Sequence, residues 1–394
     1  MRPEGNGGDS AARPEADPRG RREAVEFLMA WSRGSSPRRL PTDTWHLVPG
    51  LVEAHGLAAL VTAGLADEAP PGQAAALRDL LGRTVARGRR LAADRRRLRL
   101  ALDVAGIEFS WLKGAWLAER GLVAWDRPAA DIDLQVAPAS IPAAAAVLAT
   151  LGYAEPASTA RHRRFLRLDN RRVVEHRGEH PDNPRPVEIH PIVGESFRGL
   201  RLDLTGAPSR RHLLEDASAV VHLAAHTTAD ALGRKLRGRQ LVDLAVAADA
   251  LDGVGWRRVA DLCAAHDAGR FVWPGLTLAR HHAAARVPPR LLDTIGAGVK
   301  SALRDWVLAA DVDSLSRLAR GDARRPLGEI PRVWPRGRGE ALAVWRFILM
   351  PGRWELADRY PALAASPRWP LLYLHHAVYT VRRLAARLRT RPEG

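Results

Sequence analysis

Short segments that alternate apolar and polar residues interrupt a chain otherwise patterned for helices, and this interruption limits the possible folds most. Residues 106–114 (GIEFSWLKG), 130–136 (ADIDLQV) and 185–193 (RPVEIHPIV) show the alternation, which is typical of strands. Before residue 105 and after residue 212, apolar residues recur at helical spacing. The sequence therefore predicts an α+β fold with a small mixed β-sheet core, flanked by N-terminal helices and a C-terminal helical region.

These patterns divide the chain into four regions, the first of them rich in Gly, Pro and charged residues. We predict a disordered tail over 1–22, an N-terminal helical region over 23–105, an α/β core over 106–205 and a C-terminal helical region over 206–394. The Arg-rich stretch at 87–99 is expected to be a solvated helix face. Within the core we further predict helices over 114–119 and 139–151, the second closed by a turn, and strands over 164–169 and 171–177.

Composition narrows the functional classes. The single Cys263 excludes an internal disulfide and a cysteine-based zinc site, and no apolar run reaches the roughly 18 residues of a membrane-spanning helix. These features favour a cytoplasmic protein. The net charge of +16 suggests anionic partners, but nearly all of the cationic residues are arginine, a bias that a high-GC genome produces by itself. Nucleic acid is therefore not the expected partner.

Asp131 and Asp133 stand one residue apart on the second predicted strand. Residues i and i+2 of a strand face the same side, so both carboxylates point to one place while Ile132 and Leu134 face the other side. Carboxylates that converge in this way repel each other unless a cation lies between them, and a divalent metal ion is the usual solution. The alternative is an exposed, solvated strand face.

Glu188 and His190 repeat the arrangement in VEIHP. If this strand lies beside the one with the two aspartates, Glu188 supplies a third carboxylate. Three acidic groups support a site for two Mg²⁺ ions, one activating an attacking hydroxyl and the other holding a leaving pyrophosphate. Glu188 has an alternative role as the partner of an arginine. For His190 we expect a structural role or a hydrogen bond to a metal-bound carboxylate.

The stretch WLKGAW offers a phosphate contact. Gly114 follows a strand and opens a helix, whose first backbone N–H groups are free to bind phosphate oxygens. Lys113 adjoins it and is one of only three lysines, with Lys235 and Lys300. A position that keeps Lys in so Arg-rich a chain is a candidate phosphate ligand; a plain strand-end charge is the alternative.

Four blocks in this order resemble a known family: LKGAWLAERG (112–121), RPAADIDLQV (127–136), LGY (151–153) and VEIHPI (187–192). They are similar to the bacterial uncharacterised nucleotidyltransferase family of the DNA-polymerase-β-like nucleotidyltransferase superfamily. Flanking segments at 51–65 and 220–246 also agree. The resemblance implies a nucleotidyltransferase core in which Asp131, Asp133 and Glu188 bind metal and Gly114 belongs to the phosphate loop.

The phosphate loop departs from the superfamily pattern at one position. The superfamily favours Ser after the loop glycine, whereas this chain has Ala115 after Gly114. Because the serine hydroxyl is absent, backbone N–H groups, together with Lys113 or Arg127, are expected to contact the phosphates.

Two histidines and one aspartate of the C-terminal region are further candidates. His222 and His226 lie at i and i+4 of a predicted helix, but the zinc-protease motif needs Glu immediately after the first histidine, and Leu223 stands there. We therefore expect a packed or site-lining pair. Asp243 lies four residues after Arg239, as in a helix-surface ion pair.

The alternative for Asp243 is a role in the cleft, where it would line the nucleotide side together with Arg234, Lys235 and Arg239.

The tail at residues 353–390 combines Trp, Leu and Tyr with a basic end. It is either a buried helix with a solvated Arg end or a weak contact for a membrane surface.

Together these features predict a Mg²⁺-dependent enzyme that transfers a nucleoside monophosphate from an NTP to a hydroxyl or phosphate acceptor. The acceptor would be a small molecule, a peptide or a protein. The alternative is a non-catalytic scaffold that binds a nucleotide or a peptide through a degenerate nucleotidyltransferase core. A nucleic-acid binder acting through the arginine faces is a third and weaker possibility, which predicts a steep loss of affinity with salt.

Overall fold

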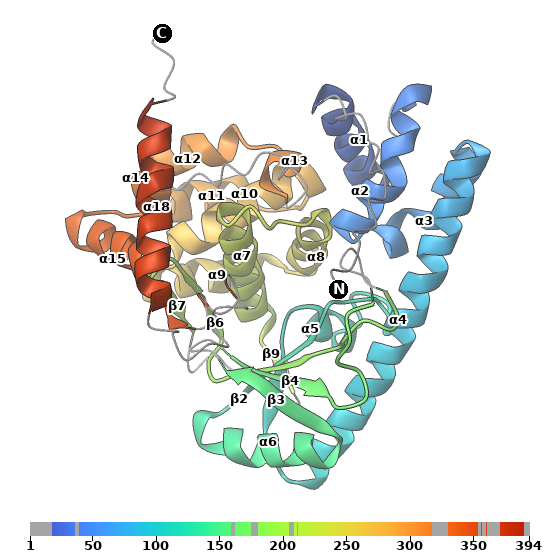
Figure 1. The fold of residues 1–394 in the computed structure, drawn as a ribbon, viewed down its shortest axis with the longest axis horizontal. Helices are drawn as coiled ribbons and strands as arrows, with labels where there is room; N and C mark the ends of the chain where they lie inside the picture. The colour runs from blue at the N-terminus through green and yellow to red at the C-terminus, as the bar shows by residue number, and fades with distance from the viewer. Residues whose placement is uncertain are drawn as a thin grey trace, which may run out of the picture.

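The computed structural model describes residues 18–35, 39–158, 162–174, 180–204, 209–210, 212–316, 330–353, 356, 360 and 371–389. The main β-sheet lies at one end of the molecule with α6 (Ile141–Thr150) beneath it, and the helical regions gather at the other end (Figure 1). The long helix α4 (Pro71–Val104) runs along one side and joins the two ends. None of the described helices is both long and apolar enough to cross a membrane.

The N-terminal helices precede α4. They are α1 (Pro18–Trp31), the 3-10 helix η1 (Thr42–Leu47), α2 (Val48–His55) and α3 (Ala58–Glu68). Gly56 ends α2 in the left-handed conformation, at φ +65°, where glycine carries no steric penalty. Of the tail predicted over 1–22, residues 1–17 lie outside the described residues, whereas residues 18–22 belong to α1, in which Arg21 pairs with Asp313 at 2.8 Å.

Helix α4 presses closely on the chain that leads into the site. An added Cβ at Gly88 would lie 1.8 Å from the carbonyl oxygen of Asp126, so only glycine allows this approach. The solvated face predicted for residues 87–99 is wrong for Arg87 and Arg95, which are 2% and 4% exposed. Arg95 stacks over Trp125, and Arg87 is enclosed by backbone carbonyls.

The main sheet has seven strands in the order β3-β4-β5-β2-β1-β9-β8. They are β1 (Phe109–Trp111), β2 (Ile132–Val136), β3 (Tyr153–Ser158), β4 (Arg163–Arg167), β5 (Val187–His190), β8 (Ser209–Arg210) and β9 (Leu213–Leu214). β2 runs parallel to β5 and antiparallel to β1, so the mixed sheet predicted from the sequence is confirmed. A separate antiparallel hairpin consists of β6 (Gly194–Phe197) and β7 (Leu200–Asp203).

The sheet differs from the prediction at two strands. The strand predicted over 171–177 is absent from its described part, residues 171–174. The reason is that β4 already pairs with β3 on one side and β5 on the other, which leaves it no free edge. The second difference is β3. It follows the 3-10 helix η2 (Pro138–Ser140) and the predicted helix α6, at the place where the sequence indicated only a turn. Its Pro156 is tolerated because β3 is an edge strand whose register shifts between Ala154 and Ala157.

After β9, the described part of the chain forms helices. They are α7 (Asp216–Leu232), α8 (Gly238–Asp249), α9 (Gly253–Ala265), α10 (Gly269–Ala283), α11 (Pro289–Gly296), α12 (Ser301–Leu308), α13 (Val312–Leu315), α14 (Ile330–Val333), α15 (Arg338–Leu349) and α18 (Leu371–Arg389). In α18, buried His376 bonds the carbonyl oxygen of Ile348, while Leu371 and Leu374 are exposed. One face of the tail helix thus packs on α15; membrane contact through the other stays a prediction.

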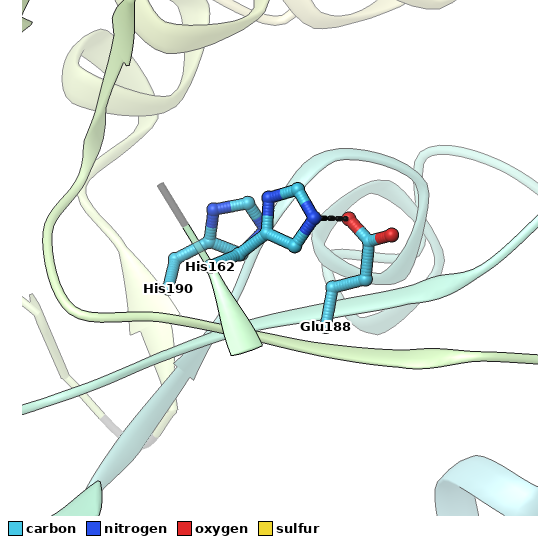
Figure 2. A group of neighbouring side chains, drawn as sticks. All are labelled: His162, Glu188 and His190. Atoms are coloured by element: carbon cyan, nitrogen blue, oxygen red, sulfur yellow. Dashed lines mark ion pairs between the residues drawn. The ribbon is translucent and has the colours of Figure 1, made fainter. Parts of the chain in front are cut away.

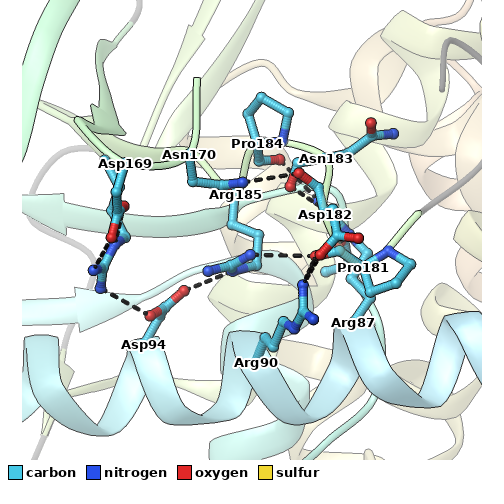
Figure 3. Close-up of polar contacts among 12 residues, drawn as sticks. Arg87, Arg90, Asp94, Asp169, Asn170, Pro181, Asp182, Asn183, Pro184 and Arg185 are labelled. Carbon is cyan, nitrogen blue, oxygen red and sulfur yellow. Dashed lines mark hydrogen bonds and ion pairs between the residues drawn. The ribbon is translucent and has the colours of Figure 1, made fainter. Parts of the chain in front are cut away.

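Ion pairs hold the chain before β5 against α4 (Figure 3). Arg185 lies 2.7 Å from Asp94 of α4, and Arg90 of α4 donates to the carbonyl oxygen of Pro181 at 2.8 Å. Asp94 also faces Arg167 at the end of β4, at 3.7 Å. The cavity among these residues measures about 410 Å³. This network fixes the start of β5 relative to α4.

Candidate functional site

Three carboxylates meet where β2 and β5 run side by side. The parallel register sets Asp133 opposite Glu188, and Asp131 immediately precedes β2. One carboxylate oxygen from each residue lies within 4.8 Å of the others. The convergence expected from the DID and VEIH patterns is thus present. It depends on the pairing of β2 with β5, which the sequence analysis assumed but could not predict.

Two cationic or donor side chains contact the central carboxylate. Lys113 Nζ lies 2.7 Å from Asp133 Oδ1, and His190 Nε2 lies 2.8 Å from the same oxygen. The Asp133 side chain is 3% exposed. His190 therefore contacts a candidate metal ligand, as expected for a histidine that orients a carboxylate, and Lys113 pairs with the same carboxylate.

The charges of this cluster separate its pKa values. Burial alone would raise the pKa of Asp133, but Lys113 and the hydrogen bond from His190 outweigh it and hold that pKa well below its ordinary value. Desolvation and repulsion from Asp133 raise the pKa of Asp131 to about 6. Desolvation, followed by repulsion from both aspartates, raises the pKa of Glu188 to about 8. Additional positive charge at this cluster would therefore be favourable.

A second set of ligand-type side chains shares Glu188 (Figure 2). His162 Nε2 lies 3.5 Å from Glu188 Oε2, and the rings of His162 and His190 are 5.3 Å apart. Ligand atoms of these three residues also lie within 4.8 Å of one another. Sequence reasoning missed His162 because its position depends on the antiparallel pairing of β4 with β5, which no local pattern reveals.

Helix α7 supplies the histidine pair. His226 bonds Glu195 of β6 at 2.9 Å and faces Asp230 at 3.6 Å. Burial and Lys113 would lower its pKa, but these two carboxylates raise it above its ordinary value. Burial, followed by the charge of Lys113, lowers the pKa of His222 to about 3. These contacts tie His226 to β6, and a site-lining position for the pair stays a prediction.

Arg87 of α4 ties together the two loops that lead to the carboxylates. Its guanidinium donates to the carbonyl oxygens of Ala129, Ala130, His180, Asn183 and Pro184. The first two precede Asp131 and the others precede β5. A guanidinium carries five N–H donors in a planar fork, so one side chain can fix the positions of both acidic strands. The charge run around Arg87 gave no sign of this role.

The predicted phosphate loop contacts a buried ion pair. An added Cβ at Gly114 would lie 3.0 Å from Arg127 Nη1, and Arg127 pairs with Asp243 of α8. Both side chains are largely buried, at 6% and 12% exposed. The surface pair considered for Arg239 and Asp243 is therefore wrong, because Asp243 pairs with Arg127 instead. Ala115 is buried within α5 (Lys113–Glu119).

The other residues predicted to line the nucleotide side of the cleft lie in different places. Arg239 is 9% exposed and donates to the carbonyl oxygen of Pro128 at 3.0 Å, close to the loop before Asp131. Arg234 instead donates to the carbonyl oxygen of Ser314 at 2.7 Å, near α13. Lys235 is exposed between α7 and α8, so its contact with nucleotide stays a prediction.

A cleft opens beside the carboxylates. It measures about 230 Å³, and Asp131 and Glu188 line it together with Arg164 and Arg237. Exposed Val173 adds an apolar edge. The opening gives a ligand direct access to two of the three acids.

The donor set fits a hard divalent cation. Mg²⁺ prefers carboxylate oxygens and keeps waters or phosphate oxygens in its remaining positions. Asp131, Asp133 and Glu188 offer such oxygens. Burial, followed by repulsion between the carboxylates, raises the pKa values of Asp131 and Glu188, and a bound cation would relieve the repulsion.

Comparison with known proteins agrees with this geometry. A family described as uncharacterised nucleotidyltransferase matches residues 41–284, a span that includes the acidic cluster, Arg87 and both histidines of α7. No curated protein and no solved structure matches the chain. Because the match covers more than half of the sequence, the chain belongs to the uncharacterised nucleotidyltransferase family.

Proposed function

We propose that this protein transfers a nucleoside monophosphate from an NTP to an acceptor, with release of pyrophosphate. The observation that carries the proposal is the convergence of Asp131, Asp133 and Glu188 in a chain of a nucleotidyltransferase family. We further propose that this family belongs to the DNA-polymerase-β-like superfamily, on the order of the LKG, DID and VEIH blocks.

In this proposal Asp131, Asp133 and Glu188 hold Mg²⁺. The bound metal would offset the charge of the triphosphate and polarise the reacting phosphate. Glu188 lines the cleft and would also help to deprotonate the acceptor hydroxyl. His190 keeps Asp133 oriented through its 2.8 Å contact.

The triphosphate would lie in the cleft beside Asp131. Arg164 and Arg237 line that cleft and offer cationic donors to phosphate oxygens. Gly114, Ala115 and Arg127 stay the proposed phosphate loop on the family resemblance. The acceptor carries a hydroxyl or a phosphate, and small molecules, peptides and proteins all remain within the proposal.

A labelled nucleotide tests the reaction directly. The protein is incubated with Mg²⁺, each of the four NTPs labelled at the α-phosphate, and panels of hydroxyl-bearing small molecules, peptides and proteins. Transfer of the α-label but not of a γ-label identifies nucleotidyl transfer. Asp131→Asn should abolish it, whereas Asp169→Asn, at an exposed aspartate paired with Arg167, should leave it intact. Full transfer by Asp131→Asn would refute the assignment.

A non-catalytic scaffold is the second candidate, and one contact favours it. The Lys113 ammonium on Asp133 already neutralises part of the acidic cluster, as a degenerate metal site would require. Nucleotide or peptide binding that is indifferent to Mg²⁺ and to Asp131→Asn, with no transfer to any acceptor, would support the scaffold instead.

A further inference from the structure

Lys113 lies inside the acidic cluster in an unfavourable backbone conformation. Its Nζ lies 2.7 Å from Asp133 Oδ1, and its side chain is 17% exposed. Its φ is +48°, in the left-handed region that residues with a side chain rarely adopt. The fold thus keeps a strained residue at the position that directs an ammonium group toward the three carboxylates.

The contacts of Asp133 limit how many ions it can bind. Lys113 and His190 both contact Oδ1, and a carboxylate oxygen accepts about two hydrogen bonds. Oδ1 is therefore saturated, which leaves Oδ2 as the oxygen available to a metal. Two ions bridged by Asp133 would then have to crowd onto Oδ2, unless Lys113 or His190 left Oδ1.

The charges give the same result. Asp131, Asp133 and Glu188 supply three negative charges when ionised, and Lys113 supplies one positive charge. One divalent cation would balance the two negative charges that remain. A second ion would give the site an excess of positive charge before any triphosphate arrives.

We infer that Lys113 takes the place of one of the two metal ions, so that the nucleotide-free protein binds a single divalent cation through Asp131, Asp133 and Glu188. This inference rests on the proposed function and replaces the expectation of two ions. Lys113 is then a tethered counter-ion that competes with metal for Asp133, rather than a ligand of the phosphates alone.

Mn²⁺ binding tests the inference without reference to activity. The full chain is titrated with Mn²⁺ in the absence of nucleotide, and free Mn²⁺ is measured by electron paramagnetic resonance. The variants are Lys113→Met, which keeps a long side chain but removes its charge, and Lys113→Gln as a second form should the first fail to fold. Lys300→Met is the matched control, because Lys300 is exposed and contacts the carbonyl oxygen of Arg332, outside the acidic cluster, and Asp131→Asn locates the site.

The expected result is one tightly bound Mn²⁺ per wild-type chain and per Lys300→Met chain, and a second one in Lys113→Met or Lys113→Gln. Two ions on the wild type, both weakened by Asp131→Asn, would overturn the inference but leave the proposed function standing. A single ion with unchanged affinity in both Lys113 variants would also overturn it. Binding that is absent, or equal in Asp131→Asn, would instead contradict the carboxylate site and with it the proposed function.

Discussion

The buried ion pair beneath the predicted phosphate loop makes a strong prediction about stability. Arg127 and Asp243 are 6% and 12% exposed in their side chains, and they join the loop before β2 to α8. Replacing Arg127 by Met removes the cation and leaves the Asp243 carboxylate buried. Breaking a buried pair from one side costs about 3–5 kcal/mol, because the remaining charge stays desolvated.

Urea denaturation followed by far-UV circular dichroism measures the effect. Arg127→Met should lower the free energy of unfolding by about 3–5 kcal/mol. The double variant Arg127→Met, Asp243→Leu should recover most of that loss, because it removes both charges together.

The pair of Arg120 and Asp216 provides the control. It is also an Arg–Asp pair, with two hydrogen bonds at 2.7–2.8 Å, but its side chains are 43% and 29% exposed. Exposed pairs contribute about 0–1 kcal/mol, so Arg120→Met should change stability by no more than that. Equal losses for Arg127→Met and Arg120→Met would refute the reasoning, as would a double variant no more stable than Arg127→Met.

Three further predictions concern residues that support the site. Arg87→Lys should weaken Mn²⁺ binding at the acidic cluster at least tenfold by calorimetry, because a lysine cannot reach carbonyls in both loops; unchanged affinity would contradict that role. Gly88→Ala should destabilise the protein by about 1–3 kcal/mol in the same urea assay, since its Cβ meets the Asp126 carbonyl at 1.8 Å; a neutral effect would show that α4 does not press on that loop. Burial, followed by Arg21 and Arg237, lowers the pKa of His55 to about 4, so stability present above pH 6.5 should fall by roughly 3 kcal/mol toward pH 4. His55→Asn keeps an acceptor for the Gly238 N–H and should flatten that profile in thermal melts, whereas an unchanged slope would assign the acid sensitivity to other groups.

Local patterns were sufficient for much of the core. The alternation around Asp131 and Asp133 and around Glu188 predicted strands that the structure contains as β2 and β5. A period of two fixes which side chains share a face, so the convergence of these acids could be expected once the strands were placed side by side. The helical spacing before residue 105 likewise anticipated α4.

Long-range pairing was beyond these patterns. His162 joins the site through the β4–β5 register, and Arg87 through contacts with loops 42 or more residues away in sequence. An arginine in a charge run looks the same whether it is solvated or buried against carbonyls. The missing strand at 171–174 has the same cause: β-propensity cannot tell whether a neighbouring strand has a free edge.

The most direct test of the central claim is a thermal-shift titration with the four NTPs, with and without Mg²⁺, on the wild type, Asp131→Asn and Asp169→Asn. A ligand that binds the folded state at a hundredfold excess over Kd stabilises it by roughly 2.7 kcal/mol. A Mg²⁺-dependent rise in melting temperature with at least one NTP is expected for the wild type and for Asp169→Asn, and its loss is expected for Asp131→Asn. No shift with any NTP, or a shift indifferent to Mg²⁺ and to Asp131→Asn, would contradict a metal–nucleotide site at Asp131, Asp133 and Glu188.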